Sequence, residues 1–335
     1  MLKIFFVIDF FLYLQIDMEE VIKPVERELI MAELTPDKFL RHTNKGGNEI
    51  YVTTAAESPN IMREVGRLRE LSFRIPGGGT GKSLDVDEFD TMERPYKQIV
   101  VWDPLNKELL GGYRFIAGAD VTYDAQGQPL LATSEIFTFS EKFKKEYMPI
   151  TLELGRSFVH PDYQATKMGT KSIFALDNLW DGLGAVAVTV PNIKYLFGKV
   201  TVYPQYNANA RDLIFAFIDK YFHDKEGLVI PKDPFPNSIS RDMADEIFST
   251  GDYKEDFKLM NHKVRELGVN VPPLVNAYIG LSPIMRTFGA SIIRSFGNVI
   301  EFGLLIPLDQ IYEEKKCRHI ETFLAERNER TKSNL

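Results

Sequence analysis

A carboxylate and a guanidinium lie close together in one apolar segment, Leu152-Glu153-Leu154-Gly155-Arg156-Ser157-Phe158. The segment has the composition of a strand, and burial there would raise the pKa of Glu153 toward that of a useful general base. Side chains three positions apart on a regular strand point to opposite faces, so Glu153 and Arg156 share a pocket only if the strand is bulged. Gly155 is a residue type that permits a bulge. A structural Glu–Arg pair inside a sheet is the alternative.

A bulged strand of this kind would suit acyl transfer from a thioester to an amine. That reaction needs a base for the ammonium proton, donors for the thioester oxygen and an anchor for a phosphopantetheine arm. A bulge frees backbone N–H groups, and each well-placed donor stabilises a tetrahedral oxyanion by about 3 kcal/mol. The segment therefore predicts a reaction centre with Glu153 as its base.

The loop after this strand could supply the anchor. Lys167, Gly169, Thr170 and Lys171 stand between the strand and a segment with helical apolar spacing. Backbone N–H groups and the helix dipole favour an anion at such a position, and a pantetheine phosphate fits there. A solvated turn is the alternative interpretation.

A glycine-rich segment, Pro76–Ser83, looks like a phosphate-binding P-loop, but two features argue against a nucleotide site. Pro76 stands where the first glycine belongs and has no N–H to offer. The segment also leaves a helix and enters an acidic run that contains Asp85, Asp87 and Asp90, whereas a P-loop joins a strand to a helix. A flexible lid beside the active site is the better interpretation.

Apolar periodicity predicts the elements that must position these side chains. Ser58-Pro59 and the apolar spacing that follows predict a helix through Arg74, and Lys97–Asp103 with Leu109–Ile116 predict an antiparallel hairpin. Further strands are expected at 134–139, 151–160, 195–203 and 299–307, and helices at 170–183, 209–222, within 242–268 and beyond 309. The order of elements predicts a mixed α/β (α+β) fold.

The elements divide the 335 residues into four expected regions. Residues 1–48 are an N-terminal segment, of which 1–17 has the character of a mispredicted start, with a short membrane-contacting segment as the alternative. Residues 49–235 form the catalytic core, and 236–310 a helical and strand extension that completes the acyl or acceptor pocket. Residues 311–335 are expected to be a solvated tail.

Charge and composition restrict the partners. A formal net charge of −7 argues against nucleic acid, although lysines 142, 144, 145, 167 and 171 could attract an acidic protein. The single cysteine, Cys317, cannot form an internal disulfide, so a reducing cytoplasm is expected. The histidines lack metal-ligand spacing, and no catalytic metal and no tightly bound cofactor are expected. The apolar residues of 136–139 and 274–302 are candidate walls for an acyl groove.

Several of these segments together resemble the acyl-homoserine lactone synthases, which acylate an amine from acyl-carrier protein on a fold of the GCN5-related N-acetyltransferase (GNAT) type. The matching residues are Arg69 and Phe73, Asp87 and Asp90, Arg114 in Gly111-Gly112-Tyr113-Arg114, and Glu153 with Arg156. The tryptophan of that family is absent and Gly77–Gly81 stands in its place. The departure argues against S-adenosylmethionine and lactone formation.

A closer resemblance, over about residues 60–225, is to the ornithine and glycine N-acyltransferases of bacterial aminolipid synthesis, which are loosely named hemolysins. The residues that carry it are 153–161, Leu179-Trp180-Asp181-Gly182-Leu183 and Tyr195-Leu196-Phe197-Gly198-Lys199-Val200. The resemblance implies a GNAT-like mixed sheet flanked by helices. It also implies transfer of a long-chain, often 3-hydroxy, acyl group from acyl-carrier protein to the α-amine of a small amino acid such as glycine or ornithine.

Under this resemblance Glu153, Arg156 and Arg114 are the expected catalytic residues. The two arginines would bind the acceptor carboxylate or hold Glu153 in place through charge-assisted hydrogen bonds. The expected substrate-binding residues are Arg69, Phe73, Asp87, Asp90, Gly155 and Ser157. Acyl-carrier protein and a partner O-acyltransferase are the expected protein partners. The expected location is the cytoplasm, with peripheral contact at the inner membrane face left open. Two alternatives remain, a non-catalytic, membrane-active hemolysin-like protein and an acetyltransferase that uses coenzyme A.

Overall fold

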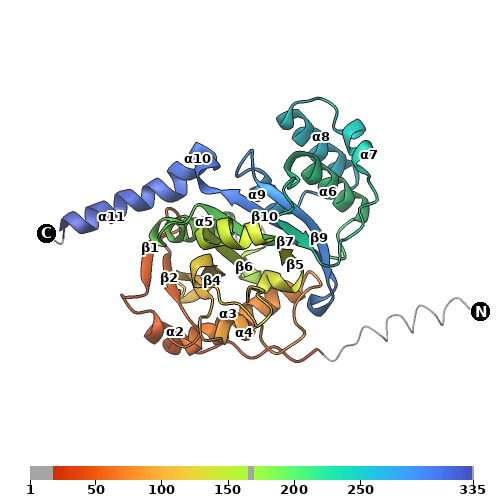
Figure 1. The fold of residues 1–335 in the computed structure, drawn as a ribbon. Helices are drawn as coiled ribbons and strands as arrows, with labels where there is room; N and C mark the ends of the chain where they lie inside the picture. The colour runs from red at the N-terminus through yellow and green to blue at the C-terminus, as the bar shows by residue number, and fades with distance from the viewer. Residues whose placement is uncertain (1–17, 165–169, 334–335) are drawn as a thin grey trace, which may run out of the picture.

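The computed structural model describes residues 18–164 and 170–333, and its centre is a mixed eight-stranded sheet (Figure 1). The strand order is β1-β2-β3-β4-β6-β7-β10-β9. Neighbouring strands are antiparallel except β6 and β7, which are parallel. The strands are β1 (Phe39–His42), β2 (Glu49–Thr53), β3 (Lys97–Asp103), β4 (Glu108–Ala117), β6 (Thr151–Val159), β7 (Tyr195–Val202), β9 (Arg286–Ile293) and β10 (Val299–Pro307).

Helices cover both faces of this sheet. One face carries α2 (Arg27–Glu33), α3 (Pro59–Arg74) and α4 (Glu88–Thr91), together with a small sheet of β5 (Phe137–Phe139) and β8 (Val229–Pro231). The other face carries α5 (Thr170–Thr189), α6 (Ala208–Phe222), α8 (Tyr253–Glu266) and α9 (Pro273–Ile279). Helix α7 (Arg241–Ile247) lies beside α6 and α8, and α11 (Thr322–Ser333) follows α10 (Glu313–Lys316) and extends from the body to the C-terminus.

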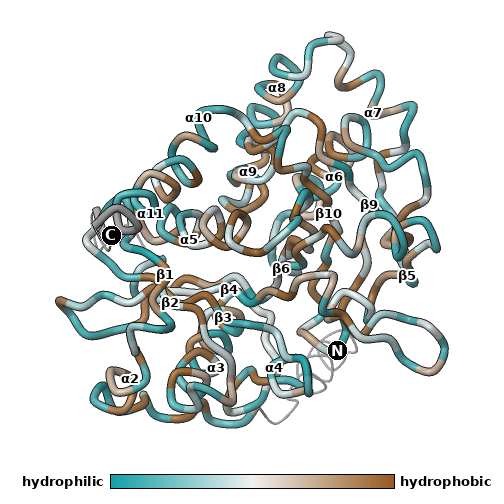
Figure 2. Tube along the Cα trace, turned by 60° about the vertical axis from the view of Figure 1, so that its left-hand side comes forward, coloured by the Kyte–Doolittle hydropathy of each residue, from teal (hydrophilic) through white to brown (hydrophobic). Residues whose placement is uncertain are grey.

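Apolar side chains fill the space between the sheet and each helical layer, and hydrophobic stretches occur in both strands and helices of the trace (Figure 2). Helix α3 is typical: Ile61, Val65 and Leu68 recur at helical spacing and are almost completely buried. Pro59 opens the helix as expected. The hydroxyl of Ser58, however, bonds to Thr53 at 2.7 Å and does not cap the helix.

The regular elements agree with the sequence-based expectations, and α3, the β3–β4 hairpin, β6, α5, β7, α6 and β10 are confirmed, with ends that differ by at most six residues. The strand expected at 134–139 is wrong in part. Residues Ala132–Glu135 form a 3₁₀ turn, and only Phe137–Phe139 are extended, in the small sheet and not in the main one. A short apolar run does not specify which strand it pairs with.

The ends of the chain contribute more to the fold than the sequence indicated. Strand β1 and helix α2 belong to the expected N-terminal segment, and β9 and β10 of the expected 236–310 extension complete the main sheet. In the expected solvated tail, His319 is buried and its Nδ1 lies 2.7 Å from Oδ1 of Asp181 on α5. The expected start at residues 1–17 lies outside the described residues, and the four-region division stays a prediction.

Candidate active site

Arg69 and Asp90 form the most deeply buried part of a polar network between α3 and the sheet. The Arg69 Nη1 and Asp90 Oδ2 atoms are 3.0 Å apart, and both side chains are fully buried. Gln98 closes the group, because it accepts a bond from Arg69 at 2.6 Å and donates one to Asp90 at 2.9 Å. Burial alone would raise the pKa of Asp90, but the positive charges of Arg69 and Arg114 lower it below its usual value.

Replacing Arg69 by methionine should lower the free energy of unfolding by about 3–5 kcal/mol, because it leaves the Asp90 carboxylate buried with half of its charge compensation removed. Urea denaturation measures the loss. Arg63 lies on the same helix with an exposed side chain, so Arg63→Met is the matched control and should change stability by less than about 0.5 kcal/mol. Equal effects for the two variants would contradict the structural role of Arg69.

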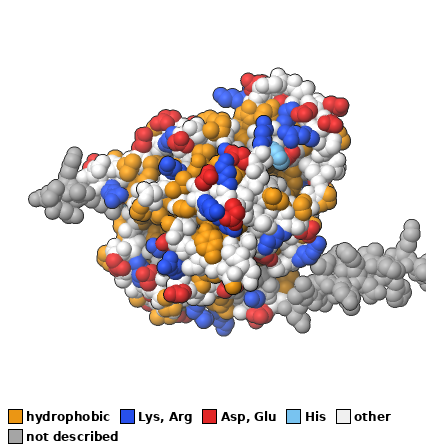
Figure 3. Space-filling model, viewed as in Figure 1, with side chains coloured by type: hydrophobic (Ala, Val, Ile, Leu, Met, Phe, Trp, Pro, Cys, Tyr) orange, Lys and Arg blue, Asp and Glu red, His pale blue; other side chains and the backbone are white. Residues whose placement is uncertain are grey.

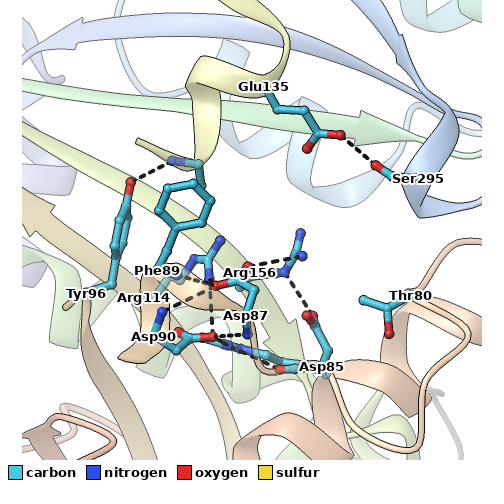
Figure 4. A network of polar contacts seen from close by, with 12 residues as sticks. Thr80, Asp85, Asp87, Phe89, Asp90, Tyr96, Arg114, Glu135, Arg156 and Ser295 are labelled. Carbon is cyan, nitrogen blue, oxygen red and sulfur yellow. Dashed lines mark hydrogen bonds and ion pairs between the residues drawn. The ribbon is translucent and has the colours of Figure 1, made fainter. Parts of the chain in front are cut away.

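Asp87 links the buried Arg69–Asp90 pair to the more exposed end of the network (Figure 4). One of its carboxylate oxygens lies 2.7 Å from Nη1 of Arg114, and the other lies 3.6 Å from Nη2 of Arg156. Arg156 also pairs with Asp85 at 2.8 Å. The side chains of Asp87 and Arg156 are 21% and 15% exposed, whereas Arg114 is 2% exposed. A substrate would therefore meet Asp87 and Arg156 first.

Glu153 is buried beside this network and is held by two donors. Its Oε2 accepts a hydrogen bond of 2.6 Å from the Tyr96 hydroxyl, and its Oε1 accepts one of 3.2 Å from the backbone N–H of Thr133. Burial raises the pKa of Glu153, while these hydrogen bonds and the charge of Arg114 oppose the rise. The guanidinium of Arg114 lies over the Tyr96 ring, 5.0 Å from its centroid, and so connects Glu153 to Asp87.

The predicted bulge is present in β6. Gly112 on β4 pairs with Phe158 and Arg114 pairs with Gly155, so two residues of β6, Arg156 and Ser157, stand opposite one residue of β4. The extra residue brings Arg156 to the α3 face, where its guanidinium stacks on Phe296 at 4.4 Å. Glu153 reaches Tyr96 in the same layer. The bulge therefore does bring the carboxylate and the guanidinium to one face.

The conformational role assigned to Gly155 is wrong. Arg156 takes the left-handed conformation, with φ of +48°, and Gly155 is not among the residues of positive φ. A Cβ atom added at Gly155 would lie 3.5 Å from Nε of Arg114, an ordinary contact. The bulge thus places a strained backbone at a charged residue, which the ion pairs of Arg156 must stabilise.

Gly155→Ala is consequently expected to fold with a melting temperature close to that of the unchanged protein. Gly118 supplies the comparison, because a Cβ atom there would lie 1.7 Å from the backbone oxygen of Met148, and Gly118→Ala should be strongly destabilised. Thermal denaturation followed by circular dichroism checks both. A large loss of stability in Gly155→Ala alone would instead support the prediction that the bulge requires glycine at position 155.

Strands β6 and β7 stop pairing just before the bulge. They pair from Thr151 with Tyr195 to Leu154 with Gly198, whereas β6 continues to Val159 and β7 to Val202. Each strand keeps its outer neighbour, β4 or β10, so the facing edges of β6 and β7 are not paired with each other after Leu154 and Gly198. Of the expected phosphate anchors, Lys167 and Gly169 lie outside the described residues. Thr170 and Lys171 form the first turn of α5.

The remaining predicted residues are divided between the two faces. Phe73 packs edge-on against Phe296 at 5.5 Å and so borders Arg156. Ser157 lies beside the Tyr113 hydroxyl, in the core on the α5 face. The structure therefore brings Phe73 to the network and leaves Ser157 across the sheet from Glu153.

The glycine-rich segment borders the same site, although its amides face the protein. The backbone N–H groups of Thr80 and Gly81 donate to the Glu70 carboxylate at 3.0 and 2.9 Å, which removes them as phosphate ligands. Gly78 lies against Phe73 and Tyr203. These contacts agree with the rejection of a nucleotide site and with a covering role beside Phe73.

Sequence reasoning missed Tyr96, Thr133, Gln98 and Phe296. Asp85 was noticed only as part of the acidic run. Tyr96 directly precedes β3, but it reaches Glu153 across 57 positions of sequence. Phe296, in the turn before β10, carries no local indication of a contact with Arg156.

Similarity to known proteins agrees with this arrangement. Residues 68–171 match the Acetyltransferase (GNAT) domain family. The chain is 56% identical over 307 residues to the glycine N(alpha)-acyltransferase of Bacteroides thetaiotaomicron, with 92% of this chain and 91% of the relative covered. The chain belongs to the glycine N(alpha)-acyltransferase family. A second member of the family, from Phocaeicola vulgatus, is 54% identical over 315 residues, covering 94% of this chain and 97% of its own.

Membership of the glycine N(alpha)-acyltransferase family makes the protein an acyltransferase with a GNAT fold, as the resemblance implied. The structure of FeeM, an N-acyl amino acid synthase from uncultured soil microbes, aligns with a TM-score of 0.39 and 13% identity. That alignment covers 78% of this chain and 93% of FeeM.

Proposed function

We propose that this acyltransferase moves a long-chain acyl group from acyl-carrier protein to the α-amine of glycine. The name of the two relatives supports glycine as acceptor over ornithine. One observation carries the reaction centre: the bulge in β6 brings Glu153 and Arg156 to one face, next to the opening between β6 and β7. The 3-hydroxy group on the acyl chain, a partner O-acyltransferase and a role in aminolipid synthesis are the further parts of the proposal.

Glu153 acts as the base. It accepts a proton from the glycine ammonium, directly or through the Tyr96 hydroxyl to which it is bonded at 2.6 Å. The free amine then attacks the thioester carbonyl, a C–N bond forms, and the tetrahedral oxyanion is stabilised by N–H groups of the bulged strand. Collapse breaks the C–S bond, the nitrogen gives up its second proton to the departing thiolate, and the first proton passes from Glu153 to solvent, which regenerates the carboxylate. The products are an N-acyl amino acid and free phosphopantetheine thiol.

Arg156 binds the glycine carboxylate. Its Nε and Nη2 are engaged by Asp85 and Asp87, and its partial exposure leaves the guanidinium accessible for a further charge-assisted hydrogen bond. Asp87 is suited to orient the ammonium group, because it lies between Arg156 and Arg114. Arg69, Asp90 and Arg114 hold Asp87 in place from below.

The opening between β6 and β7 accommodates the phosphopantetheine arm. An extended chain with amide groups can bond to an unpaired strand edge in the manner of an added strand. Its phosphate would then reach the N-terminal turn of α5, where Thr170 and Lys171 lie and where a helix dipole favours an anion. Lys167 and Gly169 complete the proposed anchor.

The carrier protein would dock around this entrance. The lysines proposed to attract it are partly engaged, since Lys142 pairs with Glu226 and both Lys144 and Lys145 pair with Glu141. Positive and negative side chains are interspersed on the face in Figure 3. Lys167 and Lys171 are the other two lysines of the proposed docking set. Among residues 18–164 and 170–333, no helix has the length and hydropathy needed to cross a bilayer.

The decisive experiment offers the full-length protein a panel of amino acids with one of two donors, palmitoyl-acyl-carrier protein or palmitoyl-coenzyme A, and identifies products by mass spectrometry. We expect N-palmitoylglycine, formed with a higher kcat/KM from the carrier protein. Formation of acetylated products from acetyl-coenzyme A would favour the alternative acetyltransferase. Lysis of membranes by the inactive Glu153→Gln variant, with no product from any donor, would favour the hemolysin-like alternative.

A further inference from the structure

A groove on the α5 face of the sheet is distinct from the reaction centre. It has a volume of about 590 Å³ and lies where β1, β2 and β4 meet the C-terminal end of α5. Its apolar lining includes Leu40, Val52, Phe115, Val186 and Val190. The volume falls within the range of about 300–1,000 Å³ that is typical of small-molecule sites.

Most of the groove's apolar lining lies on the face of the sheet opposite Glu153, and only Ile116 of its lining belongs to the apolar cluster on the Glu153 face. Ile116 on β4 is in register with Glu153, and its neighbour Phe115 is in register with Leu154. Successive side chains of a strand point to opposite faces. Phe115 and Leu154 accordingly belong to the core beneath α5, whereas Glu153 contacts Tyr96 in the opposite layer. A molecule in the groove would lie across the sheet from the proposed acceptor site.

Two cationic side chains stand at the rim of the groove. Arg94 and Lys97 both line it and are both exposed. The side chain of neither residue makes a hydrogen bond or an ion pair with any residue of the described ranges 18–164 and 170–333, in contrast to Arg69, Arg114 and Arg156. One carboxylate, Asp120, also lines the groove, so its lining carries a net charge of +1 in a chain of net charge −7.

We propose that this groove binds a single-chain amphiphile that ends in a carboxylate, a long-chain fatty acid. The alkyl chain would occupy the space between Phe115, Val186 and Val190, where apolar surface is removed from water on binding. The carboxylate would pair with Arg94 and Lys97, which have no described partner to give up. Thr54 and Thr189 also line the groove, but their hydroxyls donate to Glu57 and Ala185, which leaves Arg94 and Lys97 as the groups that recognise the carboxylate.

The test uses the full-length protein and a palmitate analogue that carries a photoreactive diazirine on its chain, kept below its micelle concentration. After irradiation, peptide mass mapping should place the label on residues 115–117 or 186–191. Hexadecanol, which has the chain without the charge, should compete about tenfold less well than palmitate. Equal competition by the two compounds would overturn the carboxylate assignment, and labels found only around Phe73 and Phe296 would overturn the groove itself.

Paired variants separate charge from fold. Arg94→Gln with Lys97→Gln should weaken palmitate binding about tenfold, whereas the control pair Arg63→Gln with Lys254→Gln, two exposed cations elsewhere, should leave it unchanged. Val190→Asp should abolish labelling of 186–191 by placing a negative charge in the apolar wall. Binding unchanged in both groove variants would refute the proposal. The acyltransferase assay is an independent readout, so loss of palmitate binding with normal product formation separates this site from the proposed function.

Discussion

Replacing Glu153 by glutamine is expected to lower kcat by about 10²- to 10⁴-fold, the range that a positioned general base contributes. Glutamine has the shape of glutamate and retains an oxygen that can accept from Thr133 or Tyr96, but it cannot take the ammonium proton. Burial raises the pKa of Glu153, and a base must be ionised to act. The kcat/KM of the unchanged enzyme should therefore rise with pH through that elevated pKa, at a higher pH than an exposed glutamate would give.

The control for this prediction is the pH profile of Glu153→Gln itself. The acidic limb should disappear in the variant, and its melting temperature should stay near that of the unchanged protein. Tyr96→Phe provides a second comparison, because it removes the hydroxyl bonded to Glu153 and leaves the carboxylate in place. A Glu153→Gln enzyme within about threefold of normal kcat would exclude a role for this carboxylate as base.

Replacing Arg156 by lysine is expected to raise the KM for glycine by about 10- to 100-fold, with a smaller change in kcat. Lysine keeps the positive charge that compensates Asp85, but it lacks the planar fork that can hold two aspartates and a substrate carboxylate together. The left-handed backbone at position 156 is equally strained for both residues, so the comparison isolates the side chain.

Arg211 offers a matched control for this substitution. Its guanidinium also stacks on an aromatic ring, 4.6 Å from the centroid of Phe235, and it pairs with Asp212 at 2.7 Å. Arg211→Lys should leave the KM for glycine unchanged, because this arrangement lies on α6, away from the network of Asp87. A KM shift of similar size in both variants would point to a general loss of stability and not to substrate binding.

Much of the fold could be predicted because it depends on local patterns. The spacing of Ile61, Val65 and Leu68 predicts α3 without knowledge of its neighbours, and the alternating β-rich runs predict the β3–β4 hairpin. The segment 134–139 was predicted less well, because its few apolar residues fit a strand in either sheet. Thr133, just before it, turns out to donate to Glu153, which no periodicity could indicate.

The candidate site was predicted in part. Glu153 and Arg156 were predicted from the strand itself, and Arg69, Asp87, Asp90 and Arg114 from the resemblance; together they form one network. Ser157 was chosen by proximity along the chain, but the bulge turns it to the α5 face beside Tyr113. Phe296 was not considered, because its contact with Arg156 spans 140 positions and depends on how the turn before β10 packs.

By itself, the sequence determined the types of its elements and the chemistry it could perform, because helical and strand periodicity and the pKa range of a buried carboxylate are local properties. Only the tertiary structure decided which residue carries the bulge, which side chains share a face and where β6 and β7 part. One extra residue in β6 changes the face of every side chain that follows, and its position depends on the register with β4, which is set by packing between distant segments. The same packing leaves Arg94 and Lys97 beside an apolar groove, although nothing in their local sequence marks them as neighbours of α5.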